Sequence, residues 1–211
     1  MKHFSSACLL VCLAFCLSAQ KKAVTENGEE VLLFDDGTWK YAHENDGDSI
    51  SVIPVNPGLF AKGKDATFQL KSNKTGFSFW LNPQKWTFKK AVNNPAAEYE
   101  LKYKNGDVYG MIIPEQIEIP LGSLVDLAFN NARNVSSDLK VVQKEYRMVN
   151  GYKAIFMQMD GTVQGIKLSY YGYYYSSPKG TVQFITYTSQ NLMEQFKSAC
   201  EDLLNGMEET K

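Results

Sequence analysis

The sequence predicts an α+β fold, in which an antiparallel sheet is covered by two main helices and a small β-meander precedes the sheet. Apolar and polar residues alternate along several segments, as in half-buried strands. Asn-Gly and Asp-Gly pairs, which are typical of tight hairpin turns, separate these segments. Two further segments, 123–133 and 189–206, carry apolar residues at helical spacing instead.

The first 19 residues are typical of an export signal. A basic start is followed by an apolar run from Ala7 to Leu17, which is too short to cross a bilayer. We expect cleavage after about Ala19 and a periplasmic or secreted protein, with no integral membrane segment after the signal is removed. Lipidation at Cys16 is the less favoured alternative, because Phe15 stands where a lipobox has a small residue.

Removal of this segment excludes most catalytic and metal chemistry. One of the two histidines and three of the four cysteines lie within it, so His43 and Cys200 remain. One cysteine cannot form an intrachain disulfide. Cys200 lies on an apolar helical face, which is typical of a buried core cysteine. The formal net charge of −1 argues against nucleic acid as a partner. We expect no catalytic residue, no bound metal and no cofactor.

Residues 20–42 are predicted to form the small β-meander. Asn27-Gly28 and Asp35-Asp36-Gly37 supply the turns between short apolar segments. The run from Phe34 to Trp39 resembles a "DGTW" segment that follows the signal in secreted proteins of some Gram-negative bacteria. This resemblance implies no chemistry.

A linker is predicted over residues 43–58, and the main domain over residues 59–211. The linker segment is polar and acidic, and it contains Pro54 and Pro57. Its acidic cluster lacks the ligand spacing of an EF-hand calcium loop.

The main domain begins with strands and then changes period. Strands are predicted at 77–81, 86–88, 99–103 and 108–113. A helix follows over 123–133, with Ser123 in a capping position behind Pro120. Four longer strands come next, at 139–149, 152–159, 162–175 and 181–187, with turns at Asn150-Gly151, Asp160-Gly161 and 177–180. Ser189 is expected to cap the final helix, which closes at Gly206.

One motif in this domain is Gly76-Phe77-Ser78-Phe79-Trp80-Leu81-Asn82-Pro83-Gln84-Lys85-Trp86, a strand followed by Pro-x-x-Trp. Together with the Val149-Asn150-Gly151 turn, the long aromatic strands and the C-terminal helix, it resembles the PsbP-like superfamily over residues 60–207. The resemblance implies an antiparallel sheet with helices on its faces, and a protein-binding or accessory role. No functional residue transfers, because metal sites in some relatives use histidine and this domain has none.

The tyrosine-rich run within 169–176 is the most unusual feature of the sequence. Period two places Tyr170 and Tyr174 on an apolar face toward the helices. Tyr171, Tyr173 and Tyr175 lie on the opposite face, where exposed tyrosines would suit protein or glycan contact. These three, with Trp39, are the candidate binding residues. Two alternatives stay open: tyrosine favours strands in general, or this face packs under the N-terminal meander.

The sequence favours an exported, non-enzymatic module of the cell envelope with a protein partner. The alternative is a small-molecule or lipid carrier with a pocket between sheet and helices. A hydrolase that uses paired carboxylates, such as Glu115 and Glu118, is the least favoured hypothesis.

Overall fold

The computed structural model describes residues 21–24, 30–34, 37, 39–41, 53–92 and 94–210. The predicted export signal and most of the predicted linker lie outside these residues. Within them, no helix is both long and apolar enough to cross a bilayer. The elements are β1 (Lys21–Val24), β2 (Glu30–Leu33), β3 (Trp39–Tyr41), β4 (Val55–Phe60), β5 (Phe68–Lys71), β6 (Phe77–Leu81), β7 (Trp86–Lys90), β8 (Tyr99–Tyr103), β9 (Tyr109–Glu115), α1 (Leu121–Arg133), β10 (Lys140–Val149), β11 (Tyr152–Val163), β12 (Ile166–Ser177), β13 (Gly180–Ser189), α2 (Gln190–Leu204) and β14 (Met207–Glu209).

An eight-stranded sheet is the centre of the fold, in the order β4-β10-β11-β12-β13-β9-β8-β7. The predicted meander of four long strands forms its middle, and the β8–β9 hairpin extends it through the β9–β13 pair. All neighbours are antiparallel except β4, which pairs with β10 in parallel. The sheet is larger than predicted, because β4 occupies the end of the segment that was expected to be a linker.

Two three-stranded sheets complete the architecture. Strands β1, β2 and β3 pair antiparallel in that order. In the main domain, β6 lies between β5 and β14. Strand β14 was not predicted, since no strand was expected after the final helix. The chain leaves α2 at Asn205 instead, and Met207 pairs with Phe79 on β6.

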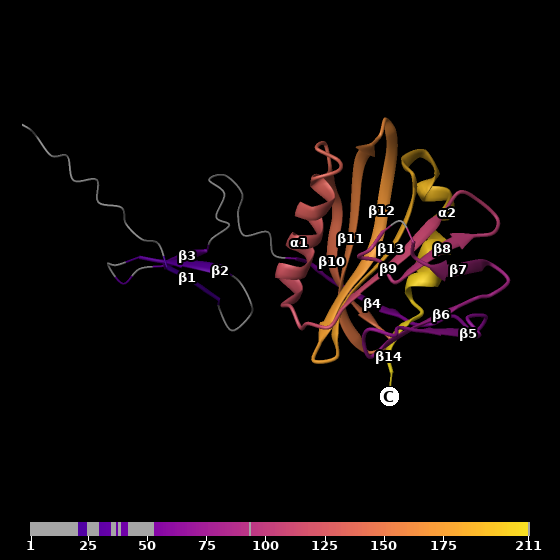
Figure 1. Ribbon diagram of the computed structural model, residues 1–211, viewed down its shortest axis with the longest axis horizontal. Helices are drawn as coiled ribbons and strands as arrows, with labels where there is room; N and C mark the ends of the chain where they lie inside the picture. The colour runs from indigo at the N-terminus through magenta and orange to yellow at the C-terminus, as the bar shows by residue number, and fades with distance from the viewer. Residues whose placement is uncertain are drawn as a thin grey trace, which may run out of the picture.

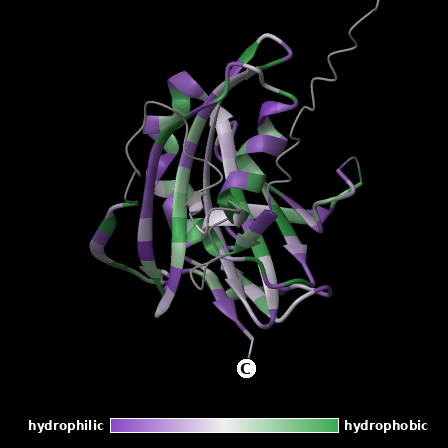
Figure 2. Ribbon diagram, turned by 90° about the vertical axis from the view of Figure 1, so that its left-hand side faces the viewer, coloured by the Kyte–Doolittle hydropathy of each residue, from purple (hydrophilic) through white to green (hydrophobic). Residues whose placement is uncertain are grey.

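The two helices cover opposite faces of the large sheet, as Figure 1 shows. Helix α1 buries Leu124, Val125 and Ala128 against one face, in a cluster with Ile155 and Tyr174. Helix α2 and the β5-β6-β14 sheet cover the other face. Their cluster includes Phe77, Phe79, Phe156, Phe184, Cys200 and Leu203. Figure 2 shows both helices banded with hydrophilic and hydrophobic residues, which is the pattern of helices with one buried side.

Of the three turns predicted between the long strands, those at Asn150-Gly151 and 177–180 agree with the structure, and the one at Asp160-Gly161 does not. Asn150 and Gly151 join β10 to β11 with φ values of 49° and 87°, as the Asn-Gly pair predicts. The turn predicted at Asp160-Gly161 is wrong, because β11 continues to Val163 and turns at Gln164-Gly165. Gly161 has a packing role instead: a Cβ at this position would overlap the Ser136 hydroxyl.

The helix starts also depart from simple capping. Helix α1 begins at Leu121, directly after Pro120, so Ser123 lies within the helix and the prediction that it caps the helix is wrong. Proline suits this place because its extended backbone (ψ 137°) leads into the first turn. Ser189 does occupy the N-cap position of α2, as predicted, but its side chain makes no capping hydrogen bond.

Replacement of Gly206 by alanine is expected to destabilise the domain. The added Cβ would overlap the backbone carbonyl of Trp80, whose own N–H donates to the Gly206 carbonyl at 2.8 Å. We expect Gly206→Ala to lower the free energy of unfolding by about 1–3 kcal/mol in urea titrations, as overpacked sites do. The matched control is Gly122→Ala in α1, where the Cβ meets no atom within 4 Å and helix propensity favours alanine. Equal stabilities of the two variants would contradict this.

Candidate functional site

The tyrosine face is covered, which corrects the prediction of its exposure. Tyr171, Tyr173 and Tyr175 are buried beneath α2 and the β5-β6-β14 sheet, and not beneath the N-terminal strands. Tyr174 lies under α1, as predicted. The physical reason is that β12 is a central strand, with a helix on each face of the sheet, so the side chains of both faces are buried from Tyr171 to Tyr175.

The three buried tyrosines bind a matching series of side chains on the C-terminal segment. The hydroxyls of Tyr171, Tyr173 and Tyr175 donate to Glu201, Asn205 and Glu209 at 2.6, 2.9 and 2.8 Å. Two residues of a strand rise by roughly 6.7 Å and four residues of a helix by about 6 Å. The spacing from Tyr171 to Tyr173 therefore matches the spacing from Glu201 to Asn205. Glu209 follows on β14. The tyrosines therefore fix the position of α2 along the sheet.

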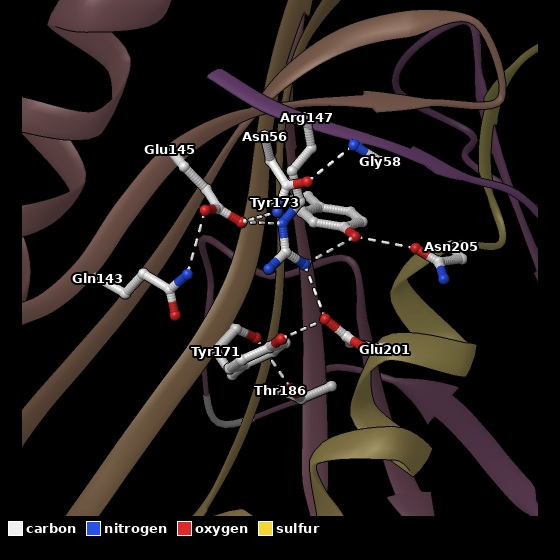
Figure 3. Close-up of polar contacts among 10 residues, drawn as sticks. All are labelled: Asn56, Gly58, Gln143, Glu145, Arg147, Tyr171, Tyr173, Thr186, Glu201 and Asn205. Carbon is white, nitrogen blue, oxygen red and sulfur yellow. Dashed lines mark hydrogen bonds and ion pairs between the residues drawn. The ribbon is translucent and has the colours of Figure 1, made fainter. Parts of the chain in front are cut away.

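A guanidinium group lies at the centre of this layer. Arg147, on β10, is 4% exposed and stacks between two rings, 3.8 Å from the Phe156 centroid and 4.4 Å from that of Phe60. Its Nε contacts Glu145 at 2.6 Å, and its Nη1 contacts Glu201 at 2.9 Å. Figure 3 shows how these groups converge from the sheet and from α2. We call Glu145, Arg147, Tyr171, Tyr173 and Glu201 the Arg147 cluster.

The Arg147 cluster also holds the edge strand β4. The Asn56 amide donates to Glu145 Oε1 at 2.9 Å, and the same Asn56 side chain accepts from the Gly58 N–H. Gln143 donates to the second carboxylate oxygen of Glu145 at 3.1 Å. One buried carboxylate thus joins β4 to β10.

The chemistry of the Arg147 cluster is structural. Burial would raise the pKa of Glu145, but the hydrogen bond from Asn56 and the contact with Arg147 lower it below its ordinary value, so this carboxylate is ionised near neutral pH. Burial raises the pKa of Tyr173 to about 12. Both groups keep one protonation state at neutral pH and are bonded to neighbours. This arrangement suits a fixed ion-pair network better than proton transfer.

Other predicted residues lie apart from this cluster. Cys200 is buried in the core as expected, and burial raises the pKa of its thiol to about 11, which disfavours reactivity. Trp39 is 54% exposed on β3, and its binding role remains a prediction. Glu118 lines an open cleft of about 370 Å³, but Glu115 is not among the lining residues. This cleft lies at the turns 73–76 and 178–180.

The sequence analysis missed Arg147, Glu145 and Glu201. The available signal was the alternation of Glu145 and Arg147 with apolar residues near the end of the strand 140–149, since opposite charges two residues apart share one face. Metal ligation has no candidate in the described part of the chain, where no group of three or more acidic, histidine or cysteine side chains is arranged to hold an ion.

Comparison by sequence finds neither a matching family model nor a matching curated protein. Comparison by structure finds the solution structure of cyanobacterial PsbP, CyanoP, from Synechocystis. The matched region covers 70% of this chain and 94% of the CyanoP chain, at 13% sequence identity and a TM-score of 0.52. The fold is PsbP-like. LpqN, involved in cell envelope biogenesis of Mycobacterium tuberculosis, covers 68% of this chain and 90% of its own, at 10% identity and a TM-score of 0.47. These likenesses concern the fold of the PsbP-like domain and carry over no residue.

Loss of the Arg147 guanidinium group should lower the stability of the PsbP-like domain. Arg147→Met leaves Glu145 buried without its cation, so we expect the free energy of unfolding to fall by about 3–5 kcal/mol. Arg147→Lys keeps the charge but loses the planar stack, and an intermediate loss is expected. The double variant Arg147→Met with Glu145→Gln should recover part of the loss, since the more deeply buried of the two carboxylates is then neutral and only the half-buried Glu201 has lost its cation. Urea denaturation followed by circular dichroism measures all three, and an unchanged stability of Arg147→Met would contradict the ion-pair account.

The acid stability of the domain should depend on Glu145. Its pKa is lower in the folded than in the unfolded chain, so its contribution is present above the ordinary value of 4.5 and is lost as pH falls through the folded value. The stability difference between the native chain and Glu145→Gln should therefore shrink as pH falls from 7 toward 3. The exposed Glu194→Gln serves as control and should show a smaller difference at every pH. A difference that stays constant with pH for Glu145→Gln would contradict the assignment.

Proposed function

We propose that this protein is an exported, non-enzymatic accessory module of the cell envelope that acts by binding a protein partner. The observation that carries the proposal is a pair of aromatic rings in contact at the surface. Phe68 and Phe88 lie 5.2 Å apart, centroid to centroid, and are 40% and 39% exposed. The charged groups of the Arg147 cluster, in contrast, are bonded to one another. Exposed aromatics on a rigid scaffold are typical of protein-binding surfaces.

Export is supported by the sequence of residues 1–19, which has the basic start, apolar run and small residues of a secretory signal. The PsbP-like fold agrees with an accessory role, since a fold of this kind supplies a stable surface and no fixed chemistry. Trp39, exposed on β3, is a second position where a partner could make contact.

The two alternative functions have less support. A carrier would need a pocket between the sheet and the helices, but aromatic side chains fill the layer beneath α2, and the cleft at the turns is open and lined by residues such as Asn73, Lys179 and Gly180. A hydrolase would need converging carboxylates with unequal proton affinities. Glu145 and Glu201 do converge, but on Arg147.

Photo-crosslinking in intact cells tests this function. A photo-crosslinking amino acid is placed in turn at Phe68, Trp39 and Val135, which are all exposed. We expect the chain in the envelope fraction with Gln20 as its first residue, and a defined adduct with one envelope protein from at least one position. Retention of the chain in the cytoplasm would contradict the proposal, and so would the absence of an adduct at all three positions.

A further inference from the structure

The open edge of the large sheet lies beside the exposed aromatic pair. Strand β7 is an edge strand of the eight-stranded sheet, and β5 is an edge strand of the β5-β6-β14 sheet. Figure 1 shows both strands at the same margin of the domain. Phe88 on β7 contacts Phe68 on β5 and also the buried Tyr99, at 6.2 Å between centroids. The aromatic core therefore reaches solvent where the two sheet edges meet.

Some backbone N–H and C=O groups of β7 point outward along this edge. No other strand in the described part of the chain forms hydrogen bonds with them. Ala91 donates its N–H to Glu98, and Lys104 donates to Lys85, at 3.0 and 2.8 Å. In an antiparallel pair, hydrogen-bonded residues alternate along the strand. Thr87 and Lys89 therefore face β8, while the N–H and C=O groups of Phe88 and Lys90 face outward.

The surroundings of this edge are basic on both faces of the sheet. Strands β5, β7 and β8 carry four lysines and one glutamate, a net charge of +3. Lys89 pairs with Glu100 at 2.9 Å on the face opposite Phe88, and Lys102 lies beside them on that face. Period two places Lys90 on the face of Phe88. The like charges would repel a second copy of this edge, whereas an acidic segment would be attracted.

We propose that β7 binds an extended acidic segment of the partner as an added strand, which rests on the proposed binding function. Main-chain hydrogen bonds would form to Phe88 and Lys90, and the side chains of the segment would alternate between the two faces. Apolar residues would pack on Phe68 and Phe88, and acidic residues would meet Lys89. The partner segment is therefore one in which acidic and apolar residues alternate.

A synthetic peptide tests the inference on the isotope-labelled full chain. The probe is a capped nonapeptide of alternating glutamate and valine, followed by amide chemical-shift changes in NMR titrations. We expect the largest changes at Phe88 and Lys90, and a Kd at least about tenfold weaker for Lys89→Glu with Lys90→Glu. The control, Lys140→Glu with Lys167→Glu, makes the same charge change on exposed lysines of β10 and β12 and should bind like the native chain.

Backbone methylation of the probe separates strand addition from simple charge attraction. Two peptides are N-methylated at every second residue, one on odd and one on even positions, so that each loses the N–H groups of one edge only. We expect one of them to lose binding and the other to retain it. Binding by both peptides overturns strand addition, and so do shift changes away from β7 or no binding at millimolar peptide. If a partner crosslinks through Trp39 or Val135 in cells while β7 fails these tests, the inference fails and the proposed function stands.

Discussion

Arg147 must be charged, and it lies in the interior of the domain, where an isolated charge would be strongly unfavourable. Its two carboxylate partners and two stacked rings solve that problem together. Each partner comes from a different part of the chain: Glu145 from β10, Glu201 from α2, Phe156 from β11 and Phe60 from β4. The need to satisfy one guanidinium group therefore fixes the helix and the edge strand against the same sheet.

The tyrosine series extends this constraint along β12. Tyr171 and Tyr173 place polar tips deep in an apolar layer, and their hydroxyls find partners at Glu201 and Asn205. Tyr175 does the same with Glu209, beyond the end of the helix. The C-terminal segment is thus held by polar contacts at regular intervals and by the apolar face that includes Cys200 and Leu203. Buried polar groups that are fully bonded favour one arrangement of a core over its alternatives.

The interior and the surface of this domain have different roles. The Arg147 cluster stabilises the interior, because its carboxylates, guanidinium and hydroxyls are bonded to one another or to neighbouring side chains. The surface that we propose for a partner lies where the two sheets end, at β5 and β7. There the aromatic layer opens to solvent beside outward-facing backbone groups and lysines. The proposed recognition would use this edge of the sheet, whose shape is set by the buried layer.

The sequence by itself determined the element types over most of the main domain. Period-two patterns placed β6, β8 and the four long strands, and Asn150-Gly151 determined its turn, because these signals are local. The turn predicted at Asp160-Gly161 was wrong for the opposite reason. Glycine is needed there because a Cβ would overlap the hydroxyl of Ser136, which is distant in sequence. Strands β4 and β14 were also not predicted: β4 contains Pro57 and Gly58, β14 has only three residues, and each is defined by its pairing partner. The tertiary structure decided which face of β12 is buried. A repeat of two residues sorts side chains into two faces, but only the placement of helices on both sides of the sheet shows that Tyr171, Tyr173 and Tyr175 are part of the core.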